Sequence, residues 1–228
     1  QDCNNNVVPD ECDISSATSL DCNENEVPDE CETGCQTAEA TDIADGATVA
    51  LSTGGNPDPT ENAQAGFTNN SGSSGGSVTA SETSDPTNPQ SGGFQVLGNS
   101  VIVGTNIANG SFLLRLTVPF DEAGLGGVDP LTLDLVWYNA GTSSWELAVG
   151  ANTQNSPGFG TPVGDRFSAS GTMTPTLGDL SADLGDYGVF WNTDTLKGFV
   201  WGNVDHASTF TVAVPLAQAI RSLLRRRF

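Results

Sequence analysis

The sequence predicts a mainly β protein: a β-sandwich of the immunoglobulin-like or jelly-roll type, preceded by a helix-poor repeat arm. From Phe94 onward, short runs of β-branched and aromatic residues alternate with turn residues, and no convincing helix separates them. The first 36 residues instead contain one acidic, cysteine-bearing motif twice. A chain of 228 residues is long enough to bury a substantial core.

Composition divides the chain into four parts. Residues 1–36 form the tandem repeat arm, and residues 37–93 form a transition strand followed by a polar segment rich in Ser, Thr and Gly. Residues 94–215 form the sandwich body, and residues 216–228 form a basic tail with helical spacing of its leucines. The polar segment has the composition of a linker, with Phe67 and Val78 almost its only large apolar residues.

Eight strands are predicted in the body, at residues 94–98, 100–107, 111–120, 131–139, 144–150, 187–191, 195–204 and 208–215. Asn109-Gly110 predicts a tight hairpin between the second and third of them. In the fourth strand, strict alternation places Leu131, Leu133, Leu135 and Trp137 on one face. Strands of this kind, close together in sequence, predict a sandwich or a barrel.

Charge limits the possible partners. The chain has 28 acidic and 7 basic residues, and no Lys or Arg precedes Arg115. Nucleic acid is therefore not expected, because phosphates require basic side chains, whereas cations are natural partners. No apolar run approaches the roughly 20 residues that span a bilayer, so we expect no membrane span.

All five cysteines lie in the first 35 residues, at Cys3, Cys12, Cys22, Cys31 and Cys35. A local disulfide framework is favoured over zinc, because no pair has C-x₂-C spacing and the only histidine, His206, is distant. Clasps within each repeat and bridges between repeats both remain open. Cys35 is the odd cysteine, which either pairs with another chain or has a different state. An N-terminal Gln followed by such a framework is typical of a mature secreted chain, so we expect an extracellular or cell-surface location.

The repeated motif reads Asp-Cys-Asn-x-Asn-x-Val-Pro-Asp-Glu-Cys-acid, with a period of 19 residues. Counted from its Asp, positions 1, 3, 5, 9 and 12 carry oxygen donors, and position 7 can offer a backbone carbonyl. Calcium takes six to eight oxygen ligands, so the pattern predicts about two calcium ions. The candidate ligands are Asp2, Asn4, Asn6, Val8, Asp10 and Asp13 in the first loop and Asp21, Asn23, Asn25, Val27, Asp29 and Glu32 in the second.

The motif resembles the calcium loops of dockerin and thrombospondin type 3 repeats, above all the D-C-N-x-N-x-x-P-D-E-C versions in secreted proteins of planctomycete-type bacteria. That resemblance implies calcium binding and an extracellular setting. Position 6 is normally Gly but is Val7 and Glu26 here, so we expect a loop geometry unlike that of an EF-hand. Only seven residues, Ile14 to Leu20, separate the loops, which favours a helix-poor arm of the thrombospondin type. The competing interpretation is a solvated acidic segment without bound metal.

No catalytic constellation stands out, and we expect a protein that is not an enzyme. The sequence lacks a nucleophile elbow that would give His206 a partner. Of the carboxylates available for glycoside hydrolysis, Asp134, Glu146, Asp165 and Asp186 among them, no two are singled out. Tryptophans in a sandwich are more often core residues than a sugar-stacking platform.

Together these features predict an extracellular structural subunit that is stabilised by calcium and polymerises head to tail into a filament or surface matrix. The candidate contact residues are Arg221, Arg225, Arg226 and Arg227 in the basic tail, which would dock on the acidic arm of another copy. The alternative is a carbohydrate-binding sandwich carried on a dockerin-like calcium tag, with glycans as partners. A monomer that retains sugar through an exposed aromatic side chain would favour that alternative.

Overall fold

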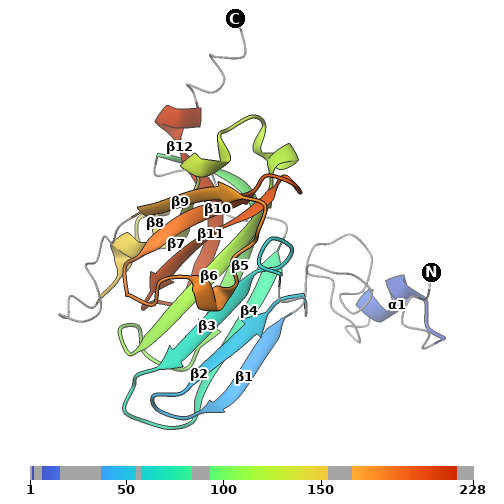
Figure 1. The fold of residues 1–228 in the computed structure, drawn as a ribbon. Helices are drawn as coiled ribbons and strands as arrows, with labels where there is room; N and C mark the ends of the chain where they lie inside the picture. Colours follow the sequence, from blue (N-terminus) through green and yellow to red (C-terminus); the bar gives the residue numbers. More distant parts are fainter. Residues whose placement is uncertain are drawn as a thin grey trace, which may run out of the picture.

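The chain folds into two facing six-stranded sheets, as the computed structural model shows for residues 2, 7–15, 37–54, 58–83, 93–153 and 166–219 (Figure 1). Sheet A has the order β1-β4-β5-β12-β7-β8, and sheet B has the order β2-β3-β6-β11-β10-β9. The predicted mainly β sandwich is therefore confirmed. The strands are β1 Ala38–Ile43, β2 Thr48–Ser52, β3 Gln64–Asn69, β4 Gly76–Thr83, β5 Phe94–Thr105, β6 Phe112–Asp121, β7 Asp134–Asn139, β8 Ser144–Leu147, β9 Arg166–Gly171, β10 Tyr187–Asn192, β11 Lys197–Val204 and β12 Thr209–Pro215.

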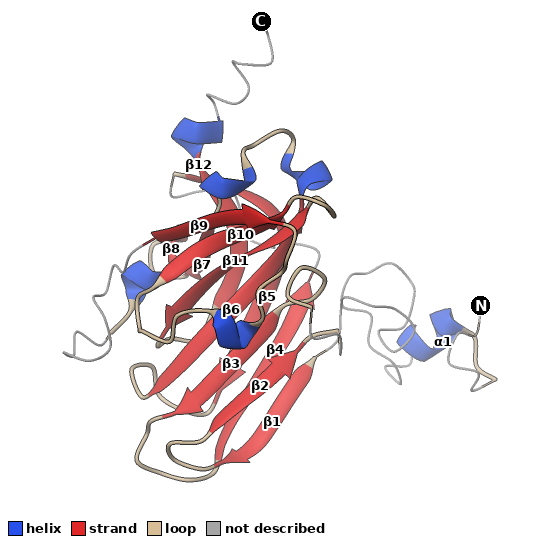
Figure 2. Cartoon of the chain, in the orientation of Figure 1, coloured by secondary structure: helices blue, strands red, loops and turns tan. Residues whose placement is uncertain are grey.

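Helical structure among the described residues is short and lies outside the strands (Figure 2). One α-helix, α1, spans Asp10–Ser15 in the first repeat. A further helical turn follows β12 at residues 216–219. Four 3₁₀ turns occupy connections between strands: η2 Glu122–Leu125, η3 Pro130–Thr132, η4 Ala148–Ala151 and η5 Leu177–Asp179.

The strands pair antiparallel except for β9, which runs parallel to β10. Hairpins within one sheet join β2 to β3, β4 to β5, β7 to β8 and β10 to β11. The hairpin predicted at Asn109-Gly110 is wrong, because β5 belongs to sheet A and β6 to sheet B. The turn instead passes from one sheet to the other, and it is held by a hydrogen bond from Gly110 N to Asp205 O at 2.6 Å.

The segment that sequence composition places ahead of the sandwich belongs to it. β1 and β4 form one end of sheet A, and β2 and β3 form one end of sheet B (Figure 1). The sandwich therefore begins at Ala38 rather than at Phe94. In β4, Gly76, Val78, Ala80 and Glu82 are buried while the residues between them are only half-buried. Small inward side chains thus form a strand whose composition is that of a linker.

The main core fills the space between the sheets. Sheet B contributes Phe67, whose ring stacks on that of Phe112 with centroids 4.9 Å apart. Leu135 and Trp137 of β7 pack in this cluster, as the predicted alternation requires. Leu131 and Leu133 pack there too, but they belong to η3 and its C-cap, because β7 begins only at Asp134. The largest fully buried members are Phe67, Leu114, Leu116, Leu133, Leu135 and Phe210.

Arg166, on the edge strand β9 of sheet B, links the two sheets. Arg166, the first residue of β9 in sheet B, forms an ion pair with Asp134 of β7 in sheet A. Its second terminal nitrogen donates to the carbonyls of Leu131, at 3.0 Å, and of Leu133. The guanidinium also lies 5.8 Å from the centroid of the Tyr187 ring. Because burial lowers the pKa of Arg166, these partners matter for keeping its charge inside the fold.

Candidate functional site

The first repeat contains a tight turn at the sixth position of the predicted calcium loop. Val7 has a φ of +72°, a left-handed conformation that non-glycine residues rarely adopt. Its backbone N–H donates to the Asp2 carboxylate at 3.1 Å, so the residue at position 1 closes the turn. Val7 therefore has the backbone conformation for which position 6 is normally Gly, and the expected departure of the loop from EF-hand geometry stays a prediction.

Two of the predicted ligands lie on the helix that follows. Asp10 and Asp13, at positions 9 and 12, are only 3% and 1% exposed. Glu11, between them on α1, is exposed. The first turn of α1 is closed by hydrogen bonds from Cys12 N and Asp13 N to Pro9 O at 2.8 and 3.1 Å. The two predicted ligand carboxylates are therefore buried, whereas the carboxylate at position 10 is exposed to solvent.

The remaining repeat and tail predictions lie outside the described residues. They are the first-loop amides Asn4 and Asn6, the second-loop ligands Asp21, Asn23, Asn25, Val27, Asp29 and Glu32, the cysteines Cys3, Cys22, Cys31 and Cys35, and the tail residues Arg221, Arg225, Arg226 and Arg227. Of the first loop, Asp2, Val8, Asp10 and Asp13 are described, and Cys12 lies exposed on α1. Within the described part of the chain, no three His, Cys, Asp or Glu side chains gather in a metal-sized group.

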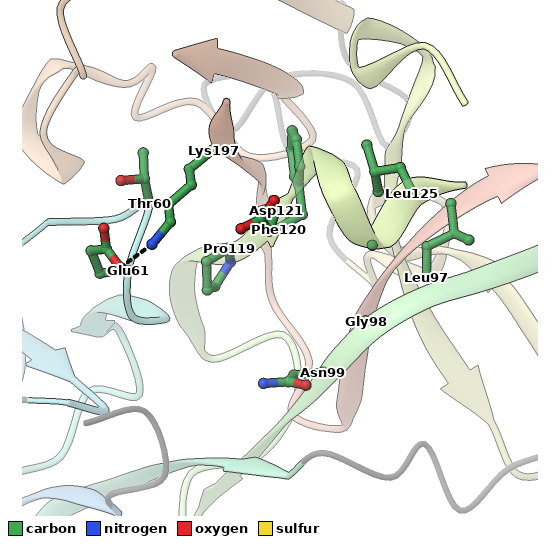
Figure 3. A pocket seen from close by; sticks show the side chains of 11 residues that line it. Thr60, Glu61, Leu97, Gly98, Asn99, Pro119, Phe120, Asp121, Leu125 and Lys197 are labelled. Carbon is green, nitrogen blue, oxygen red and sulfur yellow. Dashed lines mark hydrogen bonds and ion pairs between the residues drawn. The ribbon is translucent and has the colours of Figure 1, made fainter. Parts of the chain in front are cut away.

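A pocket of about 300 Å³ is lined by both polar and apolar side chains (Figure 3). β5 of sheet A and β6 and β11 of sheet B contribute to it, together with the loop before β3 and the turn η2. Lys197 and Glu61 point toward each other and form an ion pair at 2.8 Å, while Leu97 and Leu125 form an apolar wall (Figure 3). One carboxylate oxygen of Asp121 caps η2 by accepting a hydrogen bond from Ala123 N at 2.8 Å. The pocket's charged groups thus serve to tie loops to strands.

The carboxylates considered for acid–base chemistry have separate structural partners. Asp134 pairs with Arg166, and Glu146 accepts from Asn139 Nδ2 at 3.0 Å and Thr142 Oγ1 at 2.8 Å. Asp186 accepts from the Ser181 hydroxyl at 2.5 Å. Asp165 lies outside the described residues. Each described member of this set has a role in holding a loop or a strand.

His206 is a core residue. Its ring centroid lies 4.8 Å from that of Trp137 and 5.4 Å from that of Phe210. Burial lowers its pKa, so the imidazole is neutral at physiological pH, and Nε2–H donates to Ala148 O at 3.0 Å. The side chain therefore fastens η4 to the start of β12.

The tryptophans follow the expected core pattern. Trp145 is fully buried and meets Tyr138 edge-on, with centroids 5.4 Å apart. Trp201 is buried in a small cluster with Phe190 and Phe199, whereas Trp137 and Trp191 pack half-buried against the main core. Among the described aromatic side chains, Phe167 on β9 is the exposed one, at 53%.

Sequence reasoning missed one buried acid. Glu82 of β4 points between the sheets, and burial raises its pKa to about 7 although the backbone N–H of Ala63 donates to it at 2.9 Å. The Thr53 hydroxyl is a further partner that lowers the pKa. The alternation in the β4 sequence would have revealed the position, but only after the segment had been identified as a strand.

Fold and site together define a two-sheet β-sandwich with an acidic, loop-and-helix repeat at its N-terminal side. Comparison with known protein families, with characterised proteins and with solved structures finds no match. None of the helices in the described part of the chain has the length and apolarity needed to cross a membrane. The functional argument therefore depends on the geometry and the sequence.

Proposed function

We propose that the chain is an extracellular structural subunit, stabilised by about two calcium ions, that assembles with copies of itself into a filament or surface matrix. The observation that carries the proposal is the first repeat, where Asp2 closes a left-handed turn at Val7 and a short helix follows. A curled loop of alternating oxygen donors would need such a turn at its sixth position. The cysteine-rich repeats favour an oxidising, extracellular setting.

Calcium fits the donors of this loop better than other metals do. The candidate ligands are carboxylates, amides and a backbone carbonyl, which are hard oxygen donors. Asp10 and Asp13 are both nearly fully buried, and burying two carboxylates is costly unless a positive charge compensates. A divalent cation bound by both would provide such a charge.

The assembly part of the proposal is supported by the edges of sheet B. β2 and β9 are its outermost strands, and the side chains of β2 carry no charge. In β9 the only charged residue, Arg166, is turned inward to Asp134. Natural proteins usually protect edge strands with charges, prolines or bulges. β1, an edge of sheet A, has such protection in Glu39, Asp42 and a bulge.

A second copy is the partner that these edges favour. If β2 of one copy paired with β9 of the next, sheet B would continue from copy to copy. The contact joins two different surfaces, and a contact of this kind propagates as a filament when it does not close into a ring. The acidic repeats at one end of the sequence and the four arginines among its last eight residues add a complementary attraction between successive copies.

Calorimetry on the full chain, stripped of metal with EGTA and titrated with calcium, tests the calcium assignment. We expect about two bound ions, and we expect Asp10→Asn to remove the first site and leave about one. Glu11→Gln is the matched control, since it removes a neighbouring exposed carboxylate and should leave both sites. Absence of calcium binding, or equal effects of the two substitutions, would refute the ligand assignment.

A further inference from the structure

A second, more apolar pocket lies on the outer face of sheet B. It has a volume of about 260 Å³ and is formed by β9, β10, β11 and the loop that contains η5. Its lining residues are Phe167, Asp179, Leu180, Ser181, Asp186 and Trp201. They lie within 35 residues of one another in the sequence, so a single part of the sandwich forms the site.

The strand register explains the apolar floor of this pocket. Phe167 of β9 lies beside Gly188 of β10, which lies beside Trp201 of β11. A Cβ at position 188 would lie 2.1 Å from Phe167 O and 2.9 Å from Trp201 Nε1, so glycine lets both the β9 backbone and the indole ring come close to β10. The two aromatic residues therefore occupy the same face with no side chain between them.

The aromatic residues differ in exposure, and this gives the pocket a buried floor and an open wall. Trp201 is 3% exposed and packs with Phe190, Phe199 and Leu180, whereas Phe167 is half-exposed.

Two carboxylates with fixed orientation complete the lining. Asp179 Oδ2 accepts from the backbone N–H and the hydroxyl of Thr176, at 2.9 and 2.7 Å. Asp186 Oδ2 accepts from the Ser181 hydroxyl. The other oxygen of each carboxylate, Oδ1, has no hydrogen-bond partner in the described ranges and can accept from a ligand. The two bonds from Thr176 lower the pKa of Asp179, so it is an ionised acceptor at neutral pH.

We propose that this pocket binds a neutral pyranose unit of a polysaccharide, with one C–H face of the sugar on Phe167 above the closed floor formed by Trp201, and its hydroxyl groups donating to Asp179 and Asp186. Sugars combine an apolar ring face with a rim of hydroxyl donors, and the lining has the same two characters. Hydrogen bonds to ionised carboxylates are stronger than neutral ones, which favours hydroxyl donors at this rim.

Other ligand classes fit less well. A wholly apolar ligand would remove water from the two carboxylates without replacing their hydrogen bonds. An anionic ligand would meet Asp179 and Asp186 as well as a chain of net charge −21. The proposed site goes beyond the structural role, since it gives the subunit a glycan partner whether or not copies assemble.

An array of neutral hexose, pentose and N-acetylhexosamine oligosaccharides, probed with the full chain, tests the proposal. We expect binding to at least one glycan, followed by measurement of its dissociation constant through the fluorescence of the tryptophans. Phe167→Ala should weaken that binding at least tenfold. Because Phe167 is half-exposed, the variant should fold, and an unchanged thermal unfolding midpoint checks this.

Met173→Ala is the matched control, because Met173 is an exposed apolar residue close to β9 that does not line the pocket. It should leave the affinity unchanged, and Asp186→Asn should weaken binding through the carboxylate rim. Binding should persist in EGTA, since all lining residues belong to the sandwich, and this separates the result from calcium-dependent assembly. Lack of binding to every neutral glycan, or equal affinities of Phe167→Ala and Met173→Ala, would overturn the proposal.

Discussion

Val7 has a left-handed backbone conformation, which has a low conformational free-energy cost only for glycine. For an L-residue this conformation costs about 1–2 kcal/mol, and Val7 is 90% exposed, so side-chain packing contributes little to offset the cost. The hydrogen bond from Val7 N to Asp2 holds the turn. We infer that metal binding by the loop compensates for the rest of the strain, in agreement with the proposed calcium site.

Glu82 makes stability depend on pH. Its pKa is raised from 4.5 to about 7 in the folded protein, so the folded state binds the proton more tightly than the unfolded chain. The stabilisation is complete below about pH 4.5 and is lost as pH rises to about 7, with a total change of roughly 3 kcal/mol. The loss is nearly complete above pH 7, where Glu82 is charged inside the core.

Glu82→Gln should remove most of this dependence. The amide oxygen can still accept from Ala63 N, while the charge is absent at every pH. We expect the variant to be more stable than the wild type at pH 8, by up to roughly 3 kcal/mol, and similar to it at pH 4.5. Chemical denaturation at the two pH values measures the difference, and exposed Glu39→Gln should show no such change. An equal pH response in the wild type and Glu82→Gln would contradict the assignment.

At the scale of single elements, sequence predicts strands where side chains are large. The runs that became β6, β7, β10, β11 and β12 contain β-branched and aromatic residues in clear patterns. β3, β4 and β9 were missed because Gly, Ala, Ser and Thr dominate them, and small residues give little hydrophobic periodicity. Their strand state depends on pairing with β6, β5 and β10, and such pairing cannot be read from the composition of the paired strand itself.

The candidate sites likewise differ in how far they can be predicted from sequence. The candidate ligands of the first repeat can be proposed from sequence, because they fall within twelve residues at a recognisable spacing. The sugar pocket could not, because Phe167, Asp186 and Trp201 become neighbours only through the register of three strands. The role of Gly188 between two aromatic residues likewise appears only in the folded sheet.

The unprotected edge of β9 predicts a specific effect on assembly. Ser170 is an exposed residue of this strand, and Ser170→Lys would place a charge where another strand must approach. We expect the variant to fold and to form fewer and shorter assemblies, because pairing would require removing water from the lysine. Light scattering against protein concentration measures the effect.

Ser74→Lys provides the control for that experiment. Ser74 is an exposed residue in the β3–β4 connection, so the substitution adds the same charge away from the strand edges. It should leave assembly unchanged. If both variants assembled like the wild type, β9 would not be the contact edge.

At the scale of the whole molecule, an unequal distribution of charge accompanies the asymmetric fold. The net charge of −21 favours repulsion between copies. The arginines near the end of the sequence are positive charges that could attract an acidic part of another copy. Sheet B ends in two weakly protected strands, whereas β1 of sheet A is protected by acids and a bulge. Calcium at the repeats would lower the repulsion among acidic groups and so allow successive copies to approach.

The most direct test of this account is negative-stain electron microscopy of the purified chain in calcium and again after chelation with EGTA. We predict regular filaments or sheets in calcium that shorten or separate when calcium is removed. Dispersed monomers under both conditions would contradict a calcium-stabilised, self-assembling subunit.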